Sequence, residues 1–296
     1  MKKKIIASLL VGSIAALSAS EFSAQADKDR KAMQEYFEKK FADRKTASTY
    51  FPYTPKEELD KNFKWGIKGD EFRLGSYAFN KSGREQYEEI VEMPPYEDAI
   101  DEGKEIYENS KAIKKCFPDP AIAGEYPKFI KDKGVVTLTG AINNCLKSNG
   151  EKTWNSKKGK MTKLEAYFAA ASKEKGKKIH IVIDSKEAQE AYNRGKKEYY
   201  SQRGYLKLSC ASCHVQGAGQ RVRNEYMSPL FGQVTHFPVY RLKWEGLGTL
   251  ERRLEGCNKD QGENPHKPES KWMNELAYFM AYMSNGMPVD GPDVRK

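Results

Sequence analysis

The motif "CASCH", Cys210 to His214, constrains the fold of this chain more than any other feature. Its two thiols, three positions apart, can add to the two vinyl groups of a haem, and the adjacent histidine then reaches the iron from one side. We therefore expect Cys210 and Cys213 to attach one c-type haem and His214 to be its proximal ligand. A zinc site would need a second ligand pair at suitable spacing. The remaining histidines are scattered, and we expect surface or hydrogen-bonding roles for His180, His236 and His266.

Residues 1–26 have the layout of a secretory signal peptide. Three lysines precede the apolar run "IIASLLVGSIAAL", and the small residues of "SAQA" end at Ala26, after which we expect cleavage. The apolar run is shorter than the ~20 residues of a bilayer span. Export to the periplasm agrees with covalent haem attachment, and we expect no membrane span in the mature chain.

The mature chain stays basic. Cleavage of the signal peptide would remove three lysines and Glu21, so the formal net charge would fall by two from +10. In an exported protein this charge favours small anions or redox partners, and we expect no nucleic-acid partner.

Two halves of the chain repeat three landmarks in the same order. "GKEIY" at Gly103 resembles "GKKEY" at Gly195, 92 positions later, and "AINNCLK" around Cys145 resembles "RLEGCNK" around Cys257, 112 positions later. "EAYFAAAS", residues 165–172, resembles "LAYFMAYMS", residues 276–284, at an offset of 111. The repeat predicts a mainly α fold of two tandem cytochrome c-like domains.

The expected divisions are a signal peptide, an N-terminal part and a haem domain. The N-terminal part contains a charged extension and a degenerate, haem-free cytochrome c-like domain. Helical spacing in the extension runs through Met33, Tyr36, Phe37 and Phe41, which predicts a helix that packs against the larger body. The three divisions are residues 1–26, 27–185 and 186–296.

The first half has lost its haem motif. "CFPDP", residues 116–120, stands in the place of "CASCH", with Asp119 where Cys213 stands and Pro120 where His214 stands. If Cys257 approaches the haem of the second half, then Cys116 and Cys145 approach each other in the first. We expect a disulfide between them; the alternative, two free buried thiols, is less favoured outside the cell.

Cys257 is then the odd cysteine, with three possible fates: an intermolecular disulfide, an inert buried thiol or an axial haem ligand. The repeat favours the ligand. A thiolate lowers the haem potential, which suits a site whose sulfur itself reacts. The competing ligands are the methionines Met227, Met273, Met280, Met283 and Met287.

Arg253 precedes Cys257 by four residues, so a helix would place the two one turn apart on the same face, with Arg252 pointing elsewhere. A guanidinium there can stabilise a thiolate and dock an oxyanion through paired hydrogen bonds. A solvated arginine is the competing interpretation. The residues that would broaden the positive field, or only form a basic rim, are Arg221, Arg223, Arg241 and Lys243.

"CASCH", together with "FPVYRLKWEGLGTLERRLEGCN" at residues 237–258, resembles the SoxA family, the catalytic subunits of the SoxAX cytochrome complex of bacterial thiosulfate oxidation. The resemblance implies that His214 and Cys257 are the axial ligands and that Cys257 can carry a persulfide. It also implies that Arg253 is the active-site arginine. The "CFPDP" segment is typical of a single-haem member.

The resemblance further implies an L-cysteine S-thiosulfotransferase that couples thiosulfate oxidatively to a cysteine of a SoxYZ-like carrier protein. Electrons would leave through the haem, a SoxX-like partner in a heterodimer and a soluble cytochrome c. Two alternatives stay open. One is a non-catalytic electron-transfer cytochrome with a methionine ligand, and the other is a thiosulfate dehydrogenase that forms tetrathionate without a carrier.

Overall fold

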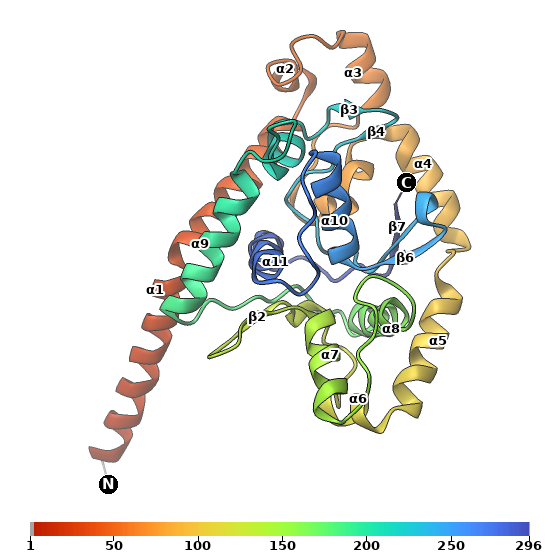
Figure 1. The fold of residues 1–296 in the computed structure, drawn as a ribbon. Helices are drawn as coiled ribbons and strands as arrows, with labels where there is room; N and C mark the ends of the chain where they lie inside the picture. Colours follow the sequence, from red (N-terminus) through yellow and green to blue (C-terminus); the bar gives the residue numbers. More distant parts are fainter. Residues whose placement is uncertain (1–2, 296) are drawn as a thin grey trace.

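The computed structural model describes residues 3–295, with side chains from residue 21 onward. This part of the chain is mainly helical (Figure 1). The α-helices are α1 (Lys3–Lys40), α2 (Arg44–Ala47), α3 (Lys56–Asn62), α4 (Lys81–Glu92), α5 (Glu97–Asn109), α6 (Lys111–Cys116), α7 (Leu138–Ser148), α8 (Lys160–Glu174), α9 (Lys186–Tyr200), α10 (Leu250–Asp260) and α11 (Lys271–Met283). Shorter helical turns are η1 (Gly69–Ala78), η2 (Ala123–Glu125), η3 (Ser212–Gln216) and η4 (Leu242–Trp244). The strands are β1 (Lys128–Ile130), β2 (Gly134–Val136), β3 (Arg221–Val222), β4 (Glu225–Tyr226), β5 (Val239–Arg241), β6 (Gly246–Gly248) and β7 (Asp293–Arg295).

The expected signal peptide, residues 1–26, begins at two residues that lie outside the described part, and the side chains of residues 3–20 are not described. Cleavage after Ala26 therefore stays a prediction. Among the described residues, no helix combines the length and the apolar character that crossing a bilayer requires.

A helix pair forms the frame of each half. In the first half α5 packs on α8, and in the second α9 packs on α11. Both pairs need a glycine, because a Cβ on Gly103 would lie 2.0 Å from the carbonyl oxygen of Lys163, and one on Gly195 would lie 2.0 Å from that of Glu275. The same close approach in both halves confirms the expected tandem architecture.

The closing helices match at a slightly different offset from the one that the sequence letters indicate. Lys163 and Glu275 are 112 positions apart, which is also the separation of Cys145 and Cys257. The letter match at 111 positions is therefore wrong by one residue. Close packing against a glycine fixes which residues of the two helices face each other. A short run of similar aromatic residues can stand one position earlier or later in the sequence without changing this packing.

The N-terminal extension packs on the second half. Helix α1 contacts both α9 and α11, and it runs beside α9 in Figure 1. Phe37 and Phe41, two positions of the predicted helical face, are completely buried. The expected packing helix is confirmed, and its far end approaches the segment that carries the haem motif.

A short hairpin leads into the cysteine-bearing helix of each half. Strands β1 and β2 precede α7, where the Thr137 hydroxyl accepts from the Gly140 amide at 3.1 Å. Strands β5 and β6 precede α10, where Thr249 accepts from the Arg252 amide at 3.3 Å. Each threonine satisfies an amide of the first helical turn that would otherwise lack a partner. Strand β7 pairs with β5 in parallel, so the sheet that precedes α10 has three strands in the order β6, β5, β7.

Candidate haem site

The haem motif lies on a single tight turn. Cys210 and Cys213 are free, partly buried thiols at this turn. Two serines fix its start, because Ser209 and Ser212 each accept a hydrogen bond from the other's backbone amide, at 3.0 and 3.1 Å. The turn thus holds both thiols and the following histidine on one short piece of backbone.

His214 has the environment of a metal-binding imidazole. Its ring Nδ1 lies 2.8 Å from the Ser228 carbonyl oxygen, which can only accept, so Nδ1 carries the hydrogen and Nε2 keeps its lone pair. Burial lowers the pKa of His214 to about 4, which keeps the ring neutral. A neutral, oriented imidazole with a free Nε2 fits the proximal position of a haem.

One cavity brings together residues from distant parts of the chain. His214, Arg253 and Cys257 all line it. They come from the motif turn and from α10, which stands near the centre of the molecule in Figure 1. The cavity also includes the apolar side chains of Leu250 and Leu254. A haem needs such a partly apolar space beside its histidine, so the residues present fit the group.

The structure narrows the choice of second ligand. Met227 lines the cavity together with Cys257. The other four candidate methionines are at most 2% exposed and belong to the hydrophobic core: Met273, Met280, Met283 and Met287. Core packing accounts for those four.

Arg253 and Arg252 point to different places, as their spacing predicts. Arg253 lines the cavity, and its positive charge helps to lower the pKa of His214. Arg252 instead donates to the Leu247 carbonyl at 3.1 Å and lies 4.2 Å from the centre of the Trp244 ring. Of these two arginines, Arg253 is the one that lines the cavity together with Cys257.

Arg241 is the member of the expected basic rim that reaches the cavity. Its guanidinium lies 3.4 Å from Glu225, its Nε has no hydrogen-bond partner in the described structure, and burial lowers its pKa. The other three rim residues are exposed: Arg221, Arg223 and Lys243.

His236 does not fit the surface or hydrogen-bonding role expected of it. Its side chain is buried, it lines the cavity, and its Nδ1 has no hydrogen-bond partner among the described residues. Burial lowers its pKa, so the ring is neutral. Nothing in its sequence surroundings distinguishes it, because its position depends on how the segment before β5 folds back over the cavity. His180 is exposed, and His266 stacks on Trp272 with ring centres 3.9 Å apart.

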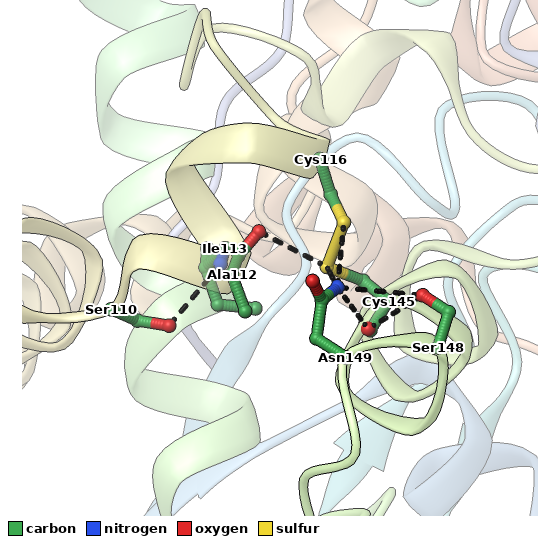
Figure 2. The surroundings of a disulfide bond; sticks show 7 residues. All are labelled: Ser110, Ala112, Ile113, Cys116, Cys145, Ser148 and Asn149. Atoms are coloured by element: carbon green, nitrogen blue, oxygen red, sulfur yellow. Dashed lines mark hydrogen bonds between the residues drawn. A yellow bond between two sulfur atoms is a disulfide. The ribbon is translucent and has the colours of Figure 1, made fainter.

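The first half is closed by a disulfide. Cys116, at the end of α6, is bonded to Cys145 on α7, with the two sulfurs 2.07 Å apart (Figure 2). Asn149 covers the bond, with its side-chain nitrogen 3.9 Å from each sulfur. The expected disulfide is confirmed. Asp119, the counterpart of Cys213, pairs with Lys175 at 2.8 Å on the surface.

A buried carboxyl pair lies between the halves. Glu165 on α8 and Glu251 on the first turn of α10 line a second cavity, and Thr139 donates to Glu165 at 2.7 Å. Burial raises the pKa of Glu165 to about 8, and the charge of Glu251 adds to this effect. Burial likewise raises the pKa of Glu251. Glu165 therefore keeps its proton well above the pH at which a free carboxyl group loses it, and the pKa of Glu251 is raised in the same direction.

The tandem helical frame, the haem-attachment turn and the facing cavity define a c-type cytochrome. A family model described as "SoxA/TsdA, cytochrome c domain" matches residues 102–177 and 194–289. Domains of this class hold a c-type haem covalently, which agrees with the chemistry of the motif turn.

Relatives identify the family within this class. The chain is 37% identical to the L-cysteine S-thiosulfotransferase subunit SoxA of Chlorobaculum tepidum over the full length of both proteins. It is 39% identical to the subunit of the same name from Allochromatium vinosum, covering 78% of this chain and 84% of the relative. The crystal structure of SoxXA from P. pantotrophus matches with a TM-score of 0.62 and 27% identity, over 69% of this chain and 79% of that one. The chain belongs to the SoxA family.

Proposed function

We propose that this chain is a haem-dependent L-cysteine S-thiosulfotransferase subunit that joins thiosulfate oxidatively to a cysteine of a carrier protein. Family membership supports the activity, since the relatives carry that name. The observation that carries the proposal is the convergence of His214, Arg253 and Cys257 on one cavity.

In this proposal the chain holds one haem. Cys210 and Cys213 would form the thioether bonds to the haem, and His214 and Cys257 would be its iron ligands. The hydrogen bond from His214 to Ser228 supports this, because it fixes the imidazole orientation that a metal bond requires. When bound, the haem would supply a one-electron acceptor.

Arg253 binds the substrate. The sulfonate of thiosulfate is an anion whose oxygens match the paired donors of a guanidinium. With Arg253 one turn before Cys257 on α10, an anchored sulfonate leaves the outer sulfur of thiosulfate facing the cysteine. The arginine thus both selects the anion and orients it.

The chemistry takes place in two steps. In the first, a bond forms between the Cys257 thiolate and the outer sulfur of thiosulfate, and the pair loses two electrons. In the second, the carrier thiolate attacks that outer sulfur, the bond to Cys257 breaks and Cys257 leaves as a thiolate. In total, one carrier thiol and one thiosulfate lose two electrons and one proton, and the carrier gains a cysteine S-thiosulfonate. A persulfide on Cys257 could take the place of its thiolate.

The two electrons require acceptors beyond this chain. We propose a SoxX-like cytochrome subunit as the immediate partner and a soluble cytochrome c as the onward acceptor. The structural likeness to a chain of the SoxXA complex supports the first of these. A SoxYZ-like carrier would complete the reaction. We place the reaction in the periplasm because the sequence of residues 1–26 predicts a signal peptide.

We retain the division of the mature chain into residues 27–185 and 186–296 as part of the proposal. A separate small core in the first half supports it. That core contains Tyr107, Ile113, Phe117, Ile142, Cys145, Leu146, Met161, Leu164 and Phe168.

Low-temperature EPR of the ferric protein tests the ligand set. The expected result is a low-spin thiolate signal in the native protein that disappears in Cys257→Met. A histidine–methionine signal in the native protein would point to Met227 as the ligand and leave an electron-transfer cytochrome as the better account. Product analysis with and without the carrier then separates the two enzymatic alternatives, because a thiosulfate dehydrogenase forms tetrathionate without it.

A further inference from the structure

A lysine of the N-terminal extension is buried directly behind the haem-attachment turn. Lys40, the last residue of α1, has a side chain with no exposed surface. Its ammonium donates to the carbonyl oxygens of Gln216 at 2.8 Å and Val215 at 3.3 Å. These are the two residues that follow His214, so the lysine contacts the motif turn across 176 positions of sequence.

Three aromatic rings surround the ammonium. The centres of the Tyr36, Tyr50 and Phe51 rings lie 5.8, 5.6 and 5.2 Å from the Lys40 nitrogen. The electron-rich ring faces stabilise a cation at such distances. Tyr36 also donates to the Val215 carbonyl at 3.5 Å, so the cage and the lysine bind the same turn.

Among the described residues, no carboxylate pairs with Lys40. A buried charge without a counter-ion costs several kcal/mol, and burial lowers the pKa of Lys40 to about 8. The ammonium is therefore still mostly protonated at neutral pH. Its carbonyl acceptors lie at the C-terminal end of a helical turn, where backbone dipoles favour a cation.

A cation at this position also affects the reduction potential of a bound haem. Reduction adds one negative charge to a haem site, and a positive charge held nearby in a low-dielectric interior favours the reduced form. A thiolate ligand has the opposite effect and lowers the potential. The charge of Lys39, the exposed residue directly before Lys40, is screened by water and has little effect on the haem potential.

We propose that Lys40 is a positioning residue of the haem site, which holds the His214 turn from behind and raises the reduction potential of the bound haem. The inference rests on the haem assignment of the proposed function but not on thiosulfate transfer. It makes the N-terminal extension, which carries no chemical motif, a working part of the redox centre.

The test uses the full chain with its haem attached and measures the midpoint potential by spectroelectrochemical titration at pH 7. The variants are Lys40→Met, which removes charge and hydrogen bonds, and Lys40→Gln, which keeps a donor for the carbonyls. Lys39→Met is the control for loss of one positive charge at the same end of α1. We expect both Lys40 variants to shift the midpoint potential downwards and Lys39→Met to leave it unchanged.

An unchanged potential in Lys40→Gln, with or without a loss of thermal stability, would overturn the electrostatic role and leave Lys40 as a packing residue. An equal shift in Lys39→Met would overturn it too, because the effect would then come from net charge. If Lys40→Met does not accumulate, Lys40→Gln alone decides. Failure of the thiosulfate-transfer assay leaves this measurement intact, because the potential is read without substrate or carrier.

Discussion

The two halves of this protein use equivalent cysteines in different ways. Cys145 and Cys257 occupy the same position on matching helices, each preceded by a hairpin and a threonine cap. In the first half the sulfur of Cys145 is held in a disulfide with Cys116. In the second half Cys257 is a free thiol that lines a cavity. The repeated fold places a cysteine at the same position in both halves. The residues opposite it, Cys116 in the first half and the haem motif in the second, determine whether its sulfur forms a disulfide or stays free.

The largest expected effect comes from removing the sulfur that remains free. Cys257→Ser should lower the rate of thiosulfate transfer to the carrier by roughly 10³-fold or more, as the loss of a catalytic nucleophile does. Haem content should not change, because the proposed thioether bonds of Cys210 and Cys213 hold the haem covalently. Helical content should not change either, because Cys257 is only partly buried. A variant that retained more than a tenth of the native rate would show that the two cysteines differ less than their surroundings indicate.

Removing the disulfide of the first half should lower the stability of the protein and leave its activity unchanged. The double variant Cys116→Ser, Cys145→Ser opens a loop of 29 positions and should lower the free energy of unfolding by about 3 to 4 kcal/mol in the chain-entropy model. Urea denaturation measures this loss. The rate of thiosulfate transfer in the folded variant serves as the control, and a marked drop would mean that the first half also takes part in the reaction.

Arg253 provides a finer test of the second half. Arg253→Gln should reduce kcat/KM for thiosulfate by roughly 10²-fold, because one charged donor to the reacting anion is lost. Arg252→Gln is the matched control on the same helix, since its side chain faces Leu247 and Trp244. Similar losses in both variants would indicate a general field effect rather than a specific anion contact.

The smallest expected effect concerns the carboxyl pair where the halves meet. A group whose pKa is raised on folding stabilises the protein at low pH, and that stability is lost as the pH rises towards the folded-state value. With the pKa of Glu165 raised to about 8, the free energy of unfolding should fall by about 2 kcal/mol between pH 6.5 and pH 8.

Urea denaturation across this pH range, with Glu165→Gln as the comparison, measures the effect. The amide keeps the contact with Thr139 but does not ionise, so its stability should depend much less on pH. Parallel curves for the two proteins would mean that folding does not raise the pKa of Glu165.

Much of this protein could be predicted from short sequence features. The spacing of "CASCH" implies haem attachment, because thioether chemistry demands two thiols and a histidine on one turn. The repeated landmarks predicted the tandem frame and, through it, the disulfide between Cys116 and Cys145. The spacing of Arg252 and Arg253 on one helix predicted that only one would face the cysteine. Each of these inferences depends on neighbours along the chain or on the repeat.

The tertiary structure alone decided which distant groups surround the site. The burial of His236 and the partial burial of Arg241 have no local sequence pattern. Lys40 is the sharpest case, since an ordinary charged segment places an ammonium against carbonyls 175 and 176 positions away. Covalent attachment and helix periodicity act over a few residues and can be read from the sequence. The surroundings of a cavity depend on how separate helices pack, which only the folded chain determines.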